Sequence, residues 1–200
     1  MDLAALEKNL KWRGIKLTVL ATKEEAADYL AGKIKGKSVG FGGSMTLETM
    51  GLYEKLKPQN EVFWHWRQDM PADEAKAKAY LADIYVTSLN GVAETGDLIN
   101  IDGSGNRVAA TLTKHEKVYF VVGENKIAPD LHAAIDRARN IAGPLNAQRL
   151  HRRTPCAIKA DRCYDCKSPE RICCSLNILW EKPMQVGECE LVLIQEKLGY

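Results

Sequence analysis

The sequence predicts an α/β fold built on an open, mostly parallel sheet, and two observations carry the prediction. Strand-like runs at residues 16–21, 38–41, 62–66 and 84–88 alternate with helix-like segments at residues 23–34, 45–50 and 71–81. Such alternation requires parallel strands joined by crossover helices. The second observation is the continuous apolar run at residues 118–122, which is typical of a central strand buried on both faces of a sheet.

Local signals place the elements in order along the chain. Residues 3–12 have the pattern of a short amphipathic helix, Thr22 is a plausible N-cap for the next helix, and Pro71 begins the helix after residues 62–66. Beyond Asn90 the alternation stops. There we predict paired strands at residues 98–101 and 108–111 joined by a tight turn, a helix at residues 130–150 interrupted before Pro144, and closing strands at residues 176–180 and 190–194.

The composition is that of a globular protein with a sizeable core, with 46% hydrophobic and 27% charged residues in a chain of 200. A net charge of +2 gives no global field that would attract nucleic acid or a membrane surface. No run approaches the roughly 18 apolar residues of a membrane span, and the first residues do not have the pattern of a signal peptide. We therefore predict a cytoplasmic protein with one domain over residues 1–200 and no membrane partner.

A glycine-rich loop follows the strand at residues 38–41 and precedes a short helix. Gly42 and Gly43 let the backbone turn tightly and approach a ligand, and Ser44 and Thr46 can bind an anion together with the free N–H groups of the helix start. The loop lacks the lysine of a P-loop and the last glycine of a dinucleotide fingerprint. It predicts a phosphate or carboxylate cradle, and the alternative is a glycine turn capped by Ser44 without a ligand.

Three charged residues follow or precede predicted strands, and open α/β sheets bind ligands at the carboxyl ends of their strands. Glu94 is expected on the same edge as the glycine loop, where a carboxylate can be a nucleophile, a base or a hydroxyl ligand. Arg107 can clamp a carboxylate or phosphate, and Lys126 can supply a further cation. The alternatives are a Glu94 that caps a turn or pairs with Arg107, a surface arginine and a solvated lysine.

Five short motifs, in this order and across most of the chain, resemble the lactate-utilisation (LUD) domain family: GGSMT at 42–46, ETG at 94–96, GNRVAA at 105–110, GENK at 123–126 and GPLNAQR at 143–149. The resemblance implies a fold related to ribose-phosphate isomerases, glucosamine-phosphate deaminases and CoA-transferases, in which a glycine loop faces the ligand. CoA-transferases carry a Glu followed closely by Gly near the active site, and residues 94–96 resemble that element.

The resemblance makes Glu94 the leading catalytic candidate. The matched motifs add Thr95 and Asn106 to the ligand-binding candidates, which are then Gly42, Gly43, Ser44, Thr46, Thr95, Asn106, Arg107 and Lys126. The family is associated with oxidation of L-lactate to pyruvate alongside iron–sulfur protein partners. This chain lacks the ferredoxin-type cysteine runs of the larger members, so the resemblance does not identify it as their electron-carrying subunit.

Five of the six cysteines fall in a Cys-rich segment at residues 151–175. Cys156, Cys163, Cys166 and Cys173 are spaced symmetrically around a close central pair, with Cys174 as a fifth thiol. Two thiolates three positions apart can chelate one ion and the outer two can return over short loops, so the four sulfurs can meet tetrahedrally. The spacing permits zinc or an iron–sulfur cluster, and the alternatives are a redox dithiol at Cys163 and Cys166 or unmodified buried thiols.

The surroundings of the cysteines complete the sequence-based prediction. Residues 149–171 contain seven basic and three acidic residues, a local excess of positive charge that favours thiolates. Short members of the LUD family carry a similar Thr-Pro-Cys and Cys-x-x-Cys tail, which implies a shared role. Cys189 is expected in the core. His65 is expected to lie opposite Trp64 and Trp66 on a strand and not to be a metal ligand.

Two functions remain open on these observations. The first is an enzyme or enzyme subunit of organic-acid utilisation that binds a small carboxylate or phosphorylated ligand at the Gly42 loop, with Glu94 opposite. The second is a non-catalytic, metal-containing module that docks to an iron–sulfur or flavin partner. A nucleic-acid-binding zinc module is disfavoured because the local charge is small and Tyr164 is the one aromatic residue available for stacking. The related folds often assemble, so a homo-oligomer also stays open.

Overall fold

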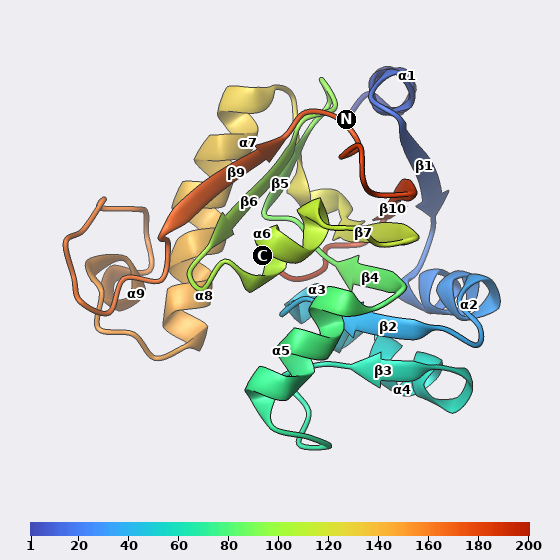
Figure 1. The fold of residues 1–200 in the computed structure, drawn as a ribbon. Helices are drawn as coiled ribbons and strands as arrows, with labels where there is room; N and C mark the ends of the chain where they lie inside the picture. The colour runs from blue at the N-terminus through green and yellow to red at the C-terminus, as the bar shows by residue number, and fades with distance from the viewer.

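The computed structural model describes residues 1–200 and is organised around two β-sheets (Figure 1). The larger sheet has six strands, all paired in parallel, in the order β1-β10-β7-β4-β2-β3. Its strands are β1 (Ile15–Leu20), β2 (Ser38–Phe41), β3 (Glu61–Phe63), β4 (Ile84–Thr87), β7 (Lys117–Gly123) and β10 (Glu188–Ile194). The predicted open parallel sheet is confirmed, and β7 lies in its interior between β10 and β4.

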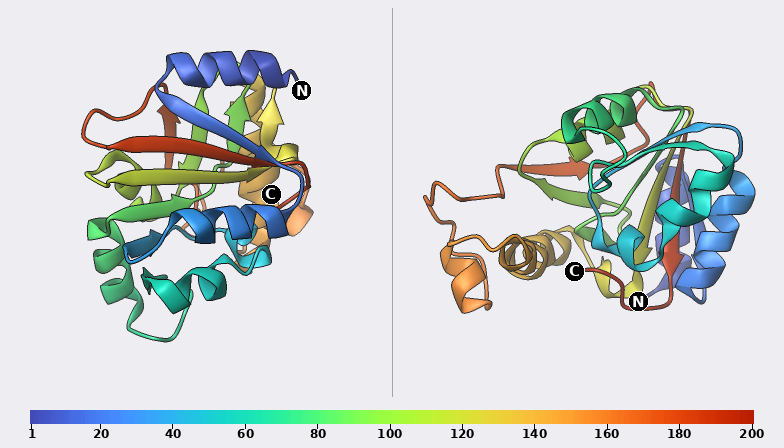
Figure 2. Two further views of the ribbon diagram at one scale, coloured as in Figure 1. Left: turned by 90° about the vertical axis from the view of Figure 1, so that its right-hand side faces the viewer. Right: turned by 90° about the horizontal axis from the view of Figure 1, so that it is seen from below.

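Helices cover both faces of this sheet (Figure 2). Alternation along β7 divides the core, because Val118 and Phe120 face one cluster of buried side chains and Tyr119 and Val121 face the other. The first cluster includes residues of α1 (Leu3–Trp12), α5 (Ala72–Leu81) and α6 (Asn106–Leu112). The second includes residues of α2 (Lys23–Lys33), α3 (Met45–Thr49) and α4 (Leu52–Leu56), and η1 (Lys57–Gln59) follows α4.

The smaller sheet continues two neighbouring strands of the larger one. Beyond β4 the chain enters β5 (Gly91–Ala93), and beyond β7 a short 3₁₀ turn η2 (Glu124–Lys126) leads into β8 (Ile127–Ala128), which pairs in parallel with β5. Antiparallel strands β6 (Leu98–Asp102) and β9 (Ser175–Leu179) complete this sheet in the order β8-β5-β6-β9. Ala134 and Ala138 of the helical segment that follows β8 are buried against it.

Helical backbone extends from α7 (Leu131–Arg137) through a π-helical turn at Ala138–Ala142 into α8 (Gly143–Arg149). The interruption predicted before Pro144 is this π-helical turn, next to the residue that has no N–H to donate. The chain then forms α9 (Pro155–Lys159) and an irregular stretch that leads to β9. None of the helices has both the length and the apolar character required to cross a membrane.

Two predicted strand assignments are wrong. Residues 108–111 belong to α6, because the Asp102 carboxylate accepts hydrogen bonds from the N–H groups of Gly105 at 3.0 Å and Val108 at 3.2 Å and so stabilises the start of a helix. Strand β3 ends at Phe63, because residues 65 and 66 form a turn. The rings of Trp64 and Trp66 stack with their centroids 5.2 Å apart.

A buried carboxylate on β10 links the two strands beside it, β1 and β7. Glu190 on β10 is fully buried, and its Oε1 accepts hydrogen bonds from Thr18 Oγ1 and Tyr29 OH, both at 2.7 Å. Its Oε2 lies 2.8 Å from the Nζ of Lys117 on β7. Burial acts to raise the pKa of Glu190, but the hydrogen bonds from Lys117, Tyr29 and Thr18 outweigh it, so the pKa is lowered overall.

We predict that Glu190→Ala lowers the free energy of unfolding by about 2–4 kcal/mol, because the largely buried Lys117 ammonium then has no buried counter-charge. A carboxylate whose pKa is lowered on folding stabilises the protein above its ordinary value of 4.5, and this contribution is lost as the pH falls through the lower folded value. Urea unfolding of both proteins from pH 7 to pH 3 should show the difference shrinking below about pH 4.5. A difference independent of pH would contradict the assignment.

Candidate functional site

A cavity of about 450 Å³ opens where the two sheets meet. The loop after β2 lines it with Gly43 and Ser44, and the β4–β5 connection lines it with Ser88 and Asn90. The turn before α6, helix α8 and the Cys-rich segment form further walls. The site therefore lies at the carboxyl ends of β2, β4 and β7, the edge at which open α/β sheets bind ligands.

Lys126 is the buried cation of this cavity. Its side chain comes from η2, directly after β7, and the residue is 3% exposed. The ammonium donates hydrogen bonds to Thr46 Oγ1 and Ser88 Oγ, both at 2.9 Å, and forms no ion pair with a carboxylate. Burial lowers the pKa of Lys126 to about 7, and the positive charges of Arg137 and Arg107 contribute to the shift. The alternative of a solvated lysine is wrong.

Two arginines add to this positive region. Arg107 donates to Ile101 O at 2.6 Å and Asn90 Oδ1 at 3.1 Å, and its Nε lies 3.7 Å from Asp102 Oδ2. Arg137 on α7 is 8% exposed and donates to the carbonyl oxygens of Asn125 and Asn90. Burial lowers the pKa of both guanidinium groups from their usual value, although an arginine stays charged at neutral pH.

The charged residues that line the cavity are mostly basic. They are Arg107, Lys126, Arg149, Arg152 and Arg171, against one acidic side chain, Asp102. His65 also lines the cavity, and burial followed by the charge of Lys76 lowers the pKa of its imidazole. A cavity with this balance attracts anions, and a neutral imidazole can donate or accept a hydrogen bond there.

Only some of the predicted residues of the glycine loop line the cavity. Gly43 and Ser44 line the cavity, whereas Gly42 packs on β4, where a Cβ would come within 2.4 Å of Thr87 Oγ1. The Ser44 hydroxyl accepts a hydrogen bond from Leu47 N at 3.2 Å and so caps α3. Thr46 is fully buried and meets the site through its contact with Lys126. Asn106, at the start of α6, lines the cavity directly.

Glu94 and Thr95 do not line the cavity. Glu94 Oε1 accepts a hydrogen bond from Asp2 N at 2.9 Å, and Thr95 Oγ1 donates to Asp97 Oδ2 at 2.6 Å. The first contact joins the loop after β5 to the start of the chain, and the second lies within the loop. The structure does not bring Glu94 opposite the Gly42 loop or into an ion pair with Arg107. A catalytic role for Glu94 stays a prediction without a contact to this cavity.

A second cavity, of about 290 Å³, is lined by all five cysteines of the Cys-rich segment. No group of three or more His, Cys, Asp or Glu side chains is placed to hold a single metal ion, so the tetrahedral convergence that the spacing permits is not observed. None of the cysteines is in a disulfide. Burial raises the pKa of the Cys173 thiol, with Arg171 acting in the opposite direction. Cys189 is buried in β10, as predicted.

The sequence alone did not identify several residues of the site. Ser88 follows the apolar strand β4 and Arg137 lies within a helical segment, and nothing in the sequence marks either residue as a neighbour of Lys126. His65 was expected to face away from Trp64 and Trp66 on a strand and not to be a metal ligand, and nothing in the sequence placed it at this cavity. Asn90 follows β4, and its position at a strand end is the one signal that could have singled it out.

Comparison with known proteins bears on the fold and on the motifs. A model of the LUD domain matches residues 3–194 of the chain, which confirms the resemblance. The fold is similar to the crystal structure of a DUF162 family protein from Deinococcus radiodurans, with a TM-score of 0.56 and 14% sequence identity over 96% of this chain and 95% of that chain. A search of curated proteins gives no match.

We predict that Lys126→Met stabilises the protein at pH 7, because it removes a buried cation that has no carboxylate partner. A lysine whose pKa falls from 10.5 to about 7 on folding binds more protons in the unfolded state between these values, so wild-type stability rises with pH there. The slope is at most ~1.4 kcal/mol per pH unit.

Denaturant unfolding from pH 6 to pH 10 should therefore show the advantage of Lys126→Met shrinking as the pH rises. Lys35→Met, at an exposed position, is the matched control and should follow the wild-type profile. Parallel profiles for Lys126→Met and the wild type would show that the ammonium carries no burial cost.

Proposed function

Because the chain belongs to the LUD-domain family, which is associated with lactate utilisation, we propose that it binds a small organic anion in the 450 Å³ cavity as part of organic-acid utilisation. The ligand class is a carboxylate or a phosphorylated metabolite. The observation that carries the proposal is Lys126, a buried cation whose partners are two hydroxyl oxygens. A bound anion would supply the counter-charge that the protein itself does not provide.

The energetics favour a ligand-binding role over a structural one. A buried ammonium without a carboxylate costs stability, and Arg107 and Arg137 increase that cost by repulsion. Groups kept in such unfavourable surroundings cluster at functional sites. Arg107, Arg149 and Arg152 provide further positive charge at the same cavity.

Two groups of the site, Lys126 and His65, can each donate or accept a proton in reactions of a bound ligand. With a pKa near 7, Lys126 is partly deprotonated in the free protein and becomes protonated when an anion binds beside it. The His65 imidazole is neutral and lines the same cavity. This pair supports acid–base chemistry on a bound hydroxy or oxo acid, and the oxidation itself would require a separate electron acceptor.

The acceptor belongs to the second part of the proposal. Members of the family are associated with iron–sulfur partners, and we propose such a partner for this chain in the cytoplasm. The position of the Cys-rich segment supports this, because it lies at the periphery and its residues also line the ligand cavity (Figure 1). Glu94 has no place in this scheme as the structure presents it.

We predict that L-lactate, pyruvate or inorganic phosphate binds to the wild-type protein in isothermal titration calorimetry, and that Lys126→Met weakens the tightest of these complexes at least about tenfold. The control Lys35→Met should bind like the wild type. Affinity should also fall as the pH rises above about 7, by up to tenfold per pH unit, because binding then requires uptake of a proton by Lys126.

Circular dichroism of Lys126→Met verifies that the variant is folded when its affinity is measured. Equal affinity of the folded variant and the wild type would remove Lys126 from the site. Absence of binding by all three anions at millimolar concentration would contradict the proposed ligand class.

A further inference from the structure

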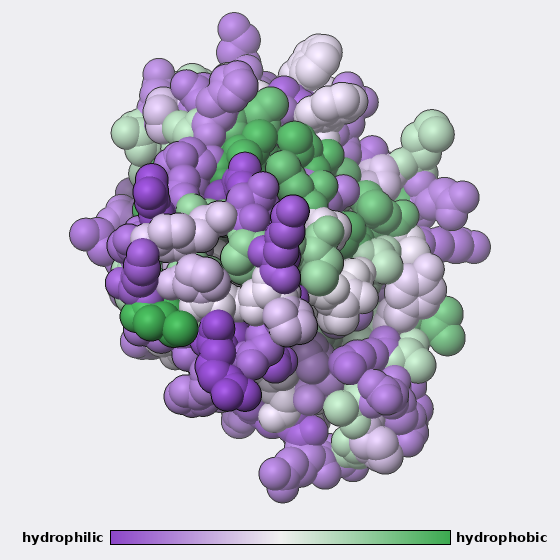
Figure 3. Space-filling view, turned by 90° about the vertical axis from the view of Figure 1, so that its left-hand side faces the viewer, coloured by the Kyte–Doolittle hydropathy of each residue, from purple (hydrophilic) through white to green (hydrophobic).

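The Cys-rich segment is a peripheral lobe that has no hydrophobic core. Of residues 151–174 only Thr154 and Ala157 are buried, and none of the 24 belongs to any of the three clusters of buried apolar side chains. In both Figure 1 and Figure 2, the lobe projects from the body of the molecule beside α8. Hydrophilic side chains dominate the face that carries it, around a smaller hydrophobic patch (Figure 3).

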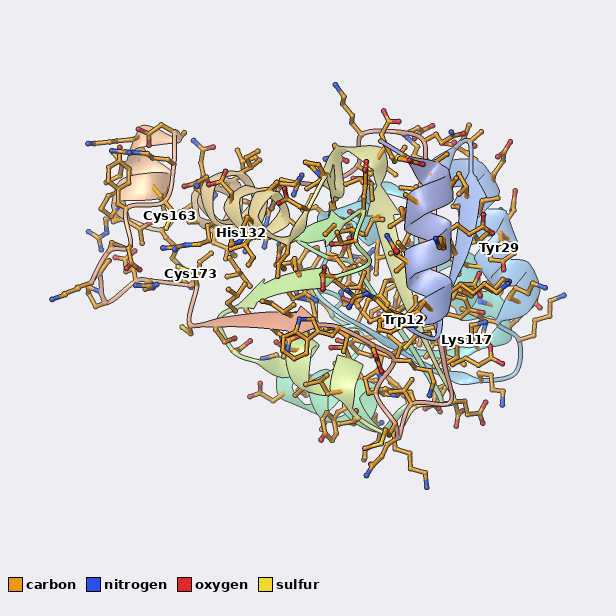
Figure 4. The ribbon with its side chains drawn as sticks, turned by 90° about the horizontal axis from the view of Figure 1, so that it is seen from above. Trp12, Tyr29, Lys117, His132, Cys163 and Cys173 are labelled. Carbon is orange, nitrogen blue, oxygen red and sulfur yellow. The ribbon has the colours of Figure 1, made fainter.

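A segment of this size without a core needs another source of stability, which in small folds is a disulfide or a metal centre. All five cysteines of the lobe are free, so disulfides do not supply it. The thiols instead face a common space, since all five line the 290 Å³ cavity. Figure 4 shows Cys163 and Cys173 in the lobe, next to the helix that carries His132.

Hydrogen bonds fix the backbone around this space. Arg171 donates to Cys166 O and Cys173 O, both at 2.9 Å, and Cys163 N donates to Asn140 Oδ1 at 2.9 Å. Between the central cysteines, Asp165 has a φ of 44°, a left-handed conformation that costs a non-glycine residue of order 1 kcal/mol. In this conformation the N–H of Asp165 points to Cys163 Sγ at 3.4 Å.

The same sulfur also faces positive charge. Arg139 from the π-helical turn donates to Cys163 Sγ at 3.8 Å, and Arg171 also lines the cavity. N–H groups and guanidinium groups directed at sulfur stabilise thiolate charge and are among the features that tune metal–thiolate centres. Asp165 is the one carboxylate among the residues that line this cavity.

Kinds of metal centre differ in how closely they require the four sulfurs to approach one another. A single zinc ion with Zn–S bonds of about 2.3 Å requires its four sulfurs within about 4 Å of one another. No three potential ligands in the structure meet the requirement for one ion. In an iron–sulfur cluster each thiolate binds its own iron or shares one with a single other thiolate, so the four sulfurs are held apart by the width of the cluster.

We propose that Cys156, Cys163, Cys166 and Cys173 bind an iron–sulfur cluster in this cavity, next to the anion site. The two cavities have six lining residues in common, among them Arg171 and Cys173. The cluster would hold the coreless lobe against α8 and β9. This inference does not depend on the identity of the anionic ligand, because cluster content is measured without it.

The test uses the full chain, purified without oxygen and then reconstituted with ferrous iron, sulfide and excess thiol. We expect the wild type to retain about two to four iron atoms and an equal amount of sulfide per chain after desalting, with visible absorption that bleaches on reduction. Cys166→Ala should lose most of this iron. Cys189→Ala removes one thiol from β10, outside the lobe, and should retain it.

Limited trypsin digestion gives a second readout that does not depend on colour. The basic residues of the lobe should be protected in the reconstituted wild type and cleaved in Cys166→Ala, while the two sheets resist digestion in both. One zinc ion per chain in place of iron, or a folded wild type that takes up no iron and sulfide on reconstitution, would overturn the proposal. Equal iron content in Cys166→Ala and the wild type would also overturn it.

Discussion

The passage of two neighbouring strands from one sheet into the other is the constraint on which the rest of the structure depends. Strands β4 and β7 pair in the larger sheet, and their continuations β5 and β8 pair in the smaller one. At the bend, Lys126 on one chain segment donates to Ser88 on the other at 2.9 Å. The cavity opens beside this junction, and the lysine is buried there against Thr46 and Ser88.

The resulting site contains buried positive charges that have no carboxylate partner. Glu190 and Lys117 show how this fold treats a buried charge when only stability matters, because each has its counter-charge within 2.8 Å. Lys126 and Arg137 have only neutral oxygens as partners. The contrast between a paired charge inside the larger sheet and unpaired charges at its carboxyl edge is the physical basis for placing ligand binding at that edge.

The cysteine lobe complements this arrangement. It contributes no apolar side chain to the core clusters, yet it forms a wall of the ligand cavity through Arg171 and Cys173. A group bound among the thiols would therefore lie next to a ligand bound in the 450 Å³ cavity. The fold thus places a cavity lined by cysteines beside a cavity lined mainly by basic side chains.

The sequence by itself determined the parallel sheet, the central strand at residues 118–122 and the family, because strand–helix alternation and ordered motifs are local properties of the chain. The sequence also identified Arg107 and Lys126 as candidate ligand-binding residues. It gave little weight to Lys126, because an isolated lysine is usually exposed to solvent. Only the tertiary structure decided that Lys126 is buried, that Glu94 lies outside the cavity and that His65 lines it. The tertiary structure also brings the charge of Arg137 close to Lys126. Burial and pairing depend on residues distant in sequence, such as Ser88 and Arg137 around Lys126, and no local pattern encodes them.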